Sequence, residues 1–467
     1  MNYVNAAFPS AGEKRERPPI AVWDHLKLET YSALPGATNM RRNIIIAGLL
    51  LVAGIIALAL YHPPMRLMPA PEVFLDGQTS IFPSYPSAVS DPEIKLFYAT
   101  NRLPVGPRAG RLYAVVPGRD LHTGVATVRI GEEGTTWDKI YAWSTGASDD
   151  RRPFLHLTNL NEQATIDSDA PLTPEATAWF AEINAAIEQS RDKDIIVYVH
   201  GANTTVERAA GQAAQLHHFT GRNSIVLLFA WPTAENFLRY SRDMVTAFGA
   251  APHLAKLIEL LDTNTGARKI DVFTYSAGAT VGSDGLAIVG RDANAPGAAA
   301  PRLGEIYHAA PDADFRAFVD DMANYADKTE RVTVAVNLGD SALRLSQVIN
   351  RASRAGRPDM RELSQEQTDW LLGATSEYGI DVLRVRPENI PGLSSRSHAF
   401  WYDDPWVSSD VLITLLYDLP AGERGLAEGE TPAGAHYWTF TPDYPEKLAE
   451  VMDRLRKEHA LIEPPVR

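Results

Sequence analysis

The sequence predicts an α/β fold with a mostly parallel central sheet and helices on both faces. Six short segments after residue 190 are rich in Val and Ile and almost continuously apolar, as expected of strands buried on both faces. Helical stretches separate them, which is typical of a parallel sheet with right-handed crossovers. The predicted strands are residues 195–199, 225–230, 270–275, 305–310, 332–337 and 380–385, with helices that include 206–219 and 253–261.

Composition bounds the class of protein. The 467 residues are 45% hydrophobic and 22% charged, as in a globular chain, and this length allows about three domains or one large domain with additions. The net charge of −14 repels phosphate backbones, so we expect no nucleic-acid partner. The absence of cysteine excludes disulfides, Cys-ligated metals and a cysteine nucleophile. No HExxH, Walker A or dinucleotide-binding fingerprint is present, so we expect no metal and no cofactor.

An apolar run near the N-terminus predicts a transmembrane helix. Residues 44–60 carry no charge and are apolar on every face, at the lower edge of the length that crosses a bilayer. Arg66 is the one nearby base after the run, whereas six bases precede it. This bias predicts an anchor over residues 43–61, with the N-terminus in the cytoplasm and the rest of the chain outside it. The preceding bases are Lys14, Arg15, Arg17, Lys27, Arg41 and Arg42.

A second interpretation of this run is a cleaved signal peptide. Translation from Met40 would place two arginines before the apolar run and a small-residue cleavage site at residues 57–59, so the chain would be secreted after cleavage behind Ala59. We favour the uncleaved anchor because a long leader precedes the run. Either way the large domain is exported.

The remaining segments give the domain plan. Residues 1–42 lack sustained periodicity and are expected to form a flexible cytoplasmic tail, and residues 62–92 are proline-rich, as in a linker. The main domain is expected over 93–467. It opens with short strands at 96–100, 111–116 and 125–130 and ends in a helix over 444–460 that packs on the body.

Polar residues after the predicted strands indicate the site, because chemistry in an open parallel sheet gathers at the carboxyl ends of its strands. Strand 270–275 leads directly into Ser276 and a small-residue helix, the context of a nucleophile elbow. The usual pattern is G-x-S-x-G, but Thr274 replaces the first glycine. An ordinary turn is the alternative interpretation of this segment.

Strand 195–199 is followed by His200, Gly201, Ala202 and Asn203. In hydrolases of this plan, an amide of this loop joins the amide after the serine in an oxyanion hole, which here predicts Ala202 and Ala277. The alternative is a simple turn with a capping Asn or Thr. We expect a structural role for His200. The candidates for lining the site are His200, Gly201, Asn203, Tyr275, Trp231 and Asp312.

An acid and a histidine complete the constellation. Asp340 follows strand 332–337, two strands after the serine strand, where a histidine-orienting carboxylate is expected. Asp312, one strand earlier, is the competing acid, and either residue could instead cap a helix. His398 lies in a loop after the last predicted strand, which gives the order Ser, Asp, His along the chain.

Several blocks in order resemble the bacterial DUF900 family of alpha/beta hydrolases, in the esterase/lipase superfamily. The resemblance runs from about residue 95 to 440. It implies the alpha/beta-hydrolase fold, with Ser276 as nucleophile, Asp340 as acid and His398 as base. Tyr275 and Ala277 replace the histidine and methionine that flank the family's serine. The matching blocks are FYATNR (97–102), LHTGV (121–125), VYVHGANTT (197–205), AAQL (213–216), FAWP (229–232), YSAG (275–278), AAPDAD (309–314), GDSALRLS (339–346) and SHAFWYDDP (397–405).

The resulting hypothesis is a membrane-anchored serine hydrolase of the bacterial inner membrane, with its catalytic domain in the periplasm. Its expected reaction is hydrolysis of a carboxylic ester through an acyl-enzyme, and its expected substrate is a small-molecule or lipid acyl compound. No protein partner is indicated. The alternatives are a non-catalytic binding protein on the same fold and a protein of envelope interactions.

Overall fold

The computed structural model describes residues 35–60, 65–75, 92–146, 152–431 and 435–458. The chain divides into two compact units, residues 1–58 and residues 59–467. Of the first unit, the structure describes helix α1, which spans Pro35–Leu60 and whose apolar residues 44–52 are exposed. Residues 1–34 of the predicted tail and residues 62–64 and 76–91 of the predicted linker lie outside the described residues. The prediction of a flexible tail is wrong for residues 35–42, which belong to α1.

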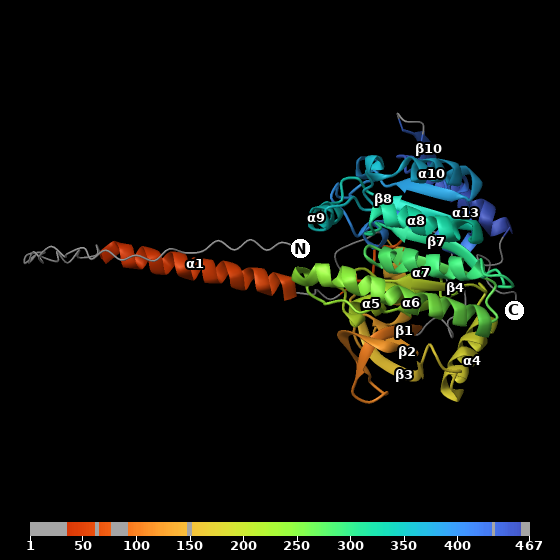
Figure 1. The fold of residues 1–467 in the computed structure, drawn as a ribbon, viewed down its shortest axis with the longest axis horizontal. Helices are drawn as coiled ribbons and strands as arrows, with labels where there is room; N and C mark the ends of the chain where they lie inside the picture. The colour runs from red at the N-terminus through yellow and green to blue at the C-terminus, as the bar shows by residue number, and fades with distance from the viewer. Residues whose placement is uncertain (1–34, 61–64, 76–91, 147–151, 432–434, 459–467) are drawn as a thin grey trace, which may run out of the picture. The chain divides into compact units, whose positions relative to one another are not determined.

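The described part of the second unit is built on one sheet of eleven strands, in the order β10-β11-β9-β8-β7-β6-β4-β5-β1-β2-β3 (Figure 1). From β11 to β1 every neighbouring pair is parallel, and antiparallel pairs close both ends. The strands are β1 (Glu93–Val105), β2 (Leu112–Ile130), β3 (Leu155–Ile166), β4 (Ile195–Val199), β5 (Ile225–Phe229), β6 (Ile270–Tyr275), β7 (Leu303–Ala309), β8 (Arg331–Val336), β9 (Ile380–Arg384), β10 (Ala427–Glu430) and β11 (His436–Thr439).

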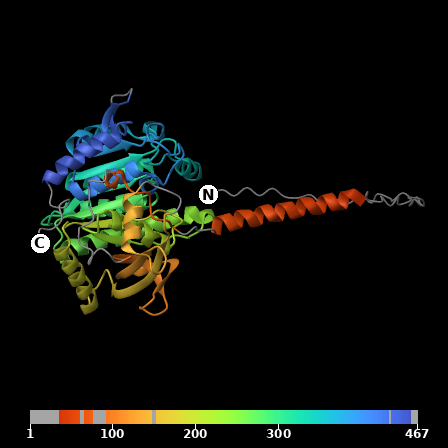
Figure 2. The ribbon, with the colours of Figure 1, turned by 180° about the vertical axis from the view of Figure 1, so that it is seen from behind.

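Helices cover both faces of the sheet and bury two separate cores. Figure 1 shows α6, α7 and α8 in front of the sheet, and Figure 2 shows α13 on the opposite side. One face carries α4 (Pro174–Gln189), α6 (Tyr240–Asn264), α7 (Gly278–Ala293), α8 (Phe315–Tyr325) and α10 (Gln365–Glu377); the other carries α3 (Trp137–Thr145), α5 (Val206–Phe219), α11 (Phe400–Asp403), α12 (Pro405–Tyr417) and α13 (Tyr444–Glu458), while α9 spans Ser341–Asn350.

The six predicted parallel strands correspond to β4–β9, each within two residues of its expected bounds. The N-terminal strands differ from the prediction. The second and third predicted strands form the single long strand β2, and β3, β10 and β11 are additional. β3 carries polar residues over much of its length, so no continuous apolar run marked it.

The predicted linker is wrong for residues 65–75, which belong to the packed domain. Leu67, Val73 and Phe74 are buried in the core that contains α5 and α12. The backbone N–H of Met68 donates to Gln215 Oε1 at 3.0 Å, and the N–H of Val73 donates to Ser409 Oγ at 3.2 Å. The prolines of this segment suggested a linker, but its apolar residues are buried in the core.

Among the described residues, α6 is the one helix that is both long enough and apolar enough to cross a membrane, and the stretch Arg42–Gly54 of α1 is apolar but shorter. More than half of the apolar stretch of α6, 56%, is buried inside the domain. Helix α6 is therefore a core helix of the domain, packed on the sheet and on α7.

Candidate active site

Ser276 lies at the turn between β6 and α7, in a backbone conformation that non-glycine residues rarely adopt. Its φ is +54°, in the left-handed region. Its N–H donates to the carbonyl of Ala309 at 3.0 Å, and its own carbonyl accepts from the N–H of Asp312 at 2.9 Å. A Cβ on Gly278 would lie 2.5 Å from the carbonyl oxygen of His200, so only glycine fits where α7 begins. This strained strand–turn–helix corner is the geometry expected of a nucleophile elbow.

Thr274 replaces the elbow's first glycine without leaving a buried hydroxyl unpaired. Its side chain is fully buried, and its Oγ1 lies 2.7 Å from Nδ1 of His308. The other ring nitrogen of His308 lies 3.2 Å from the Tyr325 hydroxyl. The Thr274 methyl group packs against the backbone of Gly282 in α7, where a Cβ would lie only 2.4 Å away. The glycine missing from the turn is thus matched by a glycine in the helix.

His398 lies between Ser276 and Asp340. Its Nε2 is 2.8 Å from Ser276 Oγ, and its Nδ1 is 2.6 Å from Asp340 Oδ2. The side chain of Asp340 is fully buried, whereas that of His398 is 20% exposed. In the neutral tautomer that fits both contacts, Nδ1–H donates to the carboxylate and Nε2 accepts from the serine hydroxyl. The structure therefore brings together the three residues predicted as catalytic.

Two groups hold this arrangement in place. Asp340 is the N-cap of α9, and its Oδ1 accepts from the N–H groups of Ala342 at 2.8 Å and Leu343 at 3.0 Å. Asn337, at the end of β8, donates its Nδ2 to the carbonyl of Ser397 at 2.8 Å, directly before His398. Both helix α9 and the histidine loop are thereby fixed to the end of one strand.

The predicted oxyanion donors lie beside the serine. Ala202 lines the same cavity as Ser276, and Ala277 follows Ser276 at the start of α7. Among the described residues, neither backbone N–H takes part in a hydrogen bond. The start of a helix also favours negative charge. These two amides are therefore available to an oxygen that gains negative charge next to Ser276.

The residues behind this loop are packed away from the cavity. His200 and Trp231 are fully buried and stacked with ring centroids 5.5 Å apart. Trp231 Nε1 donates to the His200 carbonyl at 2.6 Å, and burial lowers the pKa of His200 to about 3. Gly201 packs against the side chains of Ser276 and Tyr275. His200, Gly201 and Trp231 thus support the loop, and none of them lines the cavity.

Asp312 lines the cavity but belongs to a different network. Its carboxylate accepts from Tyr240 at 2.6 Å, from Ser346 at 2.6 Å and from Arg354 Nε at 2.6 Å. Arg354 and Asp312 form a buried ion pair. With its oxygens so occupied, and with Asp340 on His398, Asp312 forms part of the cavity wall in this structure.

The cavity over Ser276 has a volume of about 200 Å³. The predicted candidates Asn203, Tyr275 and Asp312 line it, and the Tyr275 ring lies 5.3 Å from the His398 ring. Sequence reasoning missed the part of the wall that comes from helices, because it considered only residues at strand ends. These residues are Tyr240 of α6 and Ala342, Leu345, Ser346 and Ile349 of α9.

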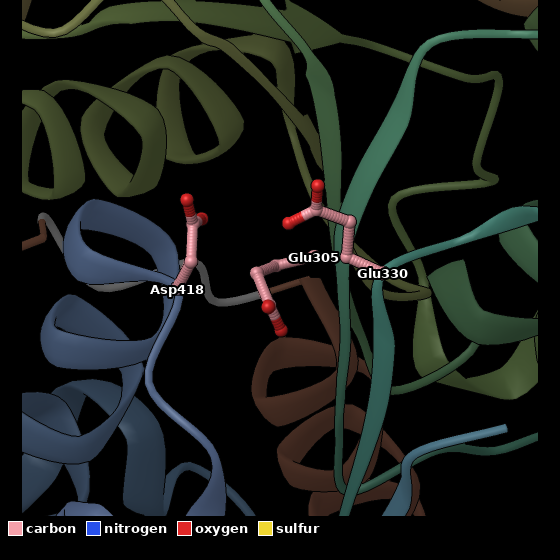
Figure 3. Close-up of side chains that lie close together, drawn as sticks. All are labelled: Glu305, Glu330 and Asp418. Atoms are coloured by element: carbon pink, nitrogen blue, oxygen red, sulfur yellow. The ribbon is translucent and has the colours of Figure 1, made fainter. Parts of the chain in front are cut away.

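A separate acidic cluster lies at the opposite ends of the strands from Ser276, and a lysine side chain is paired with it. Glu305, Glu330 and Asp418 place carboxylate oxygens within 4.8 Å of one another (Figure 3). Lys269 Nζ donates to Glu330 and, at 2.8 Å, to Asp418. Burial raises the pKa of Glu305 to about 8. The lysine ammonium makes this cluster an ion-pair network at the amino ends of the strands.

Solved structures similar to this chain include esterases and another hydrolase. Esterase 2 of Thermogutta terrifontis, phosphorylated by paraoxon, is 11% identical over 49% of this chain and 85% of its own, with a TM-score of 0.29. A protein described as a cell surface hydrolase of Lactobacillus plantarum is 10% identical over 49% of this chain and 92% of its own, with a TM-score of 0.29.

No curated protein matches the chain in sequence. Residues 175–389 match the family described as "Alpha/beta hydrolase of unknown function (DUF900)". The matched region begins in α4 and includes β4–β9, Ser276 and Asp340, and it ends shortly before His398. Residues 175–389 of this chain are therefore similar to the DUF900 family of alpha/beta hydrolases.

Proposed function

We propose that the protein is a serine hydrolase that cleaves carboxylic esters through an acyl-enzyme. The observation that carries this proposal is the position of His398, in contact with Ser276 through Nε2 at 2.8 Å and with Asp340 through Nδ1 at 2.6 Å. A base within hydrogen-bond reach of a hydroxyl, itself oriented by a buried carboxylate, is the arrangement that activates serine.

In the proposed mechanism, Ser276 Oγ attacks the ester carbonyl while His398 Nε2 takes its proton. Asp340 holds the imidazole in the required tautomer and stabilises the imidazolium. The N–H groups of Ala202 and Ala277 bind the oxyanion, each contributing about 3 kcal/mol to the transition state. His398 then protonates the leaving alcohol, and water hydrolyses the acyl group from Ser276 with His398 again acting as base.

Hydrolysis of p-nitrophenyl esters of graded chain length tests this proposal. We expect Ser276→Ala and His398→Ala each to lower kcat by about 10⁶-fold or to background, because residues of such a triad act as a unit. Thermal unfolding of each variant serves as the control for folding. Full turnover by folded Ser276→Ala would contradict the assignment, and a folded wild type that binds but turns over no ester would favour a binding protein.

We further propose that residues 44–60 anchor the chain in the bacterial inner membrane, with the hydrolase domain in the periplasm. This is supported by the uncharged, exposed apolar stretch of α1 and by the excess of Lys and Arg before it. The full chain should remain in the membrane fraction after alkaline extraction. Release of the uncleaved chain by that treatment would contradict the anchor.

A further inference from the structure

The mouth of the cavity over Ser276 is apolar and open to solvent. Leu345 and Ile349 of α9 line this cavity, yet they are 42% and 43% exposed. Residues that both line a cavity and face solvent form its rim. A ligand that enters this cavity therefore passes the aliphatic side chains of α9.

Further exposed apolar residues lie on the two elements that meet at the cavity, α6 and α9. Tyr240 OH lies 2.8 Å from Ser346 Oγ, so the start of α6 packs against α9. On these elements Val348 of α9 is 71% exposed and Val245 of α6 is 73% exposed, and Leu238, two residues before α6, is 61% exposed. Large exposed apolar side chains on elements that border a site are typical of a surface that meets a partner or a membrane. We use the name mouth surface for the exposed residues Leu238, Arg239, Arg242, Val245, Arg344, Leu345, Val348, Ile349 and Arg351.

The mouth surface is also basic, although the whole chain carries a net charge of −14. Exposed arginines lie near these aliphatic residues: Arg242 is in α6 and Arg344 is in α9, whereas Arg239 directly precedes α6 and Arg351 directly follows α9. None of these four forms an ion pair with another described residue. Residues 237–248 and 341–351 contain a single acid, Asp243, which is buried and accepts from the N–H groups of Asn203 and Ala234.

We propose that the mouth surface docks on an anionic phospholipid bilayer and that the hydrolase draws a lipid acyl ester from it. Exposed aliphatic side chains flanked by arginines suit the boundary between acyl chains and anionic headgroups. The identity of the substrate rests on the proposed serine hydrolase function, whereas the docking does not.

A single-cysteine label tests the docking, because the natural chain has no cysteine. Full-length Val348→Cys carrying an environment-sensitive dye is reconstituted into vesicles of phosphatidylcholine alone or mixed with phosphatidylglycerol. We expect a blue-shifted emission that is strongest in the mixed vesicles and is reduced by salt. Leu372→Cys, at an exposed leucine of α10, is the matched control and should show no shift.

A second measurement connects docking to substrate. Arg344→Glu combined with Arg351→Glu should lower turnover of a bilayer-embedded ester relative to a soluble ester by about tenfold or more. Equal behaviour of the labels at 348 and 372 would overturn the proposal, as would a shift that depends on protein concentration rather than on anionic lipid. If the labelled Ser276→Ala variant docks while wild type hydrolyses no ester, the docking surface stands and the proposed enzymatic function fails.

Discussion

At the scale of single residues, each of the two carboxylate oxygens of Asp340 has a different role. Oδ1 caps α9, and Oδ2 orients His398. Strand order in the sequence located this acid, the serine and the histidine, because such groups follow the carboxyl ends of strands. The same rule could not find Tyr240, Ser346 or Arg354, which come together only when α6 and α9 pack.

Asp340→Asn should therefore lower kcat by about 10⁴-fold with little loss of stability, because asparagine still caps a helix but cannot replace the carboxylate on the imidazole. Asp312→Asn should instead lower the stability of the protein and have a smaller effect on kcat. It weakens a buried ion pair with Arg354, whose loss costs about 3–5 kcal/mol, while the Ser276–His398 contact is retained. Measuring kcat and the thermal unfolding midpoint of both variants tests this. A larger kcat loss in Asp312→Asn would move the orienting acid to Asp312.

At the scale of elements, the corner between β6 and α7 shows how a departure from the usual motif is accommodated. Thr274 is where a glycine is expected, and the absence of a Cβ on Gly282 makes room for its methyl group. The sequence revealed the departure, but the compensation lies eight residues away and becomes visible only in the packing of α7 on β6. The buried strands β4–β9 were predictable because they are continuously apolar, whereas the half-polar β3 was not.

Gly282→Ala should destabilise the corner and reduce activity, since its Cβ would meet the Thr274 methyl at 2.4 Å, and overpacking of this kind costs about 1–3 kcal/mol. Thr274→Ser removes that methyl and keeps the hydroxyl for His308. The double variant Thr274→Ser/Gly282→Ala should therefore recover the stability and esterase rate of Thr274→Ser alone. Additive losses in the double variant, measured as unfolding midpoints and kcat, would exclude a direct steric coupling.

At the scale of the whole molecule, buried titratable groups oppose one another in their effect on stability. Burial lowers the pKa of His308 to about 3, so the unfolded chain binds a proton that the folded chain cannot as the pH falls below 6.5. Burial raises the pKa of Glu305 to about 8, so the folded chain holds a proton that the unfolded chain releases. The contribution of Glu305 to the stability of the folded protein is therefore lost as the pH rises. The dependence of folding on pH is the sum of these opposing terms.

Replacing His308 isolates its contribution to the pH dependence of stability. Between pH 6.5 and about 3, the unfolding free energy of wild type should fall relative to that of His308→Gln by about 1.4 kcal/mol per pH unit. Above pH 6.5 the difference between the two proteins should be constant. Denaturant unfolding of both proteins at several pH values measures it. A difference that stays constant at acid pH would mean that His308 is protonated in the folded protein.

The central claim is that His398 activates Ser276. The most direct measurement is mass spectrometry of the full-length protein after reaction with a fluorophosphonate, which labels activated serines. We expect one adduct per chain, located at Ser276 and lost in His398→Ala. A folded wild type that stays unlabelled, or an adduct on another serine, would contradict the account.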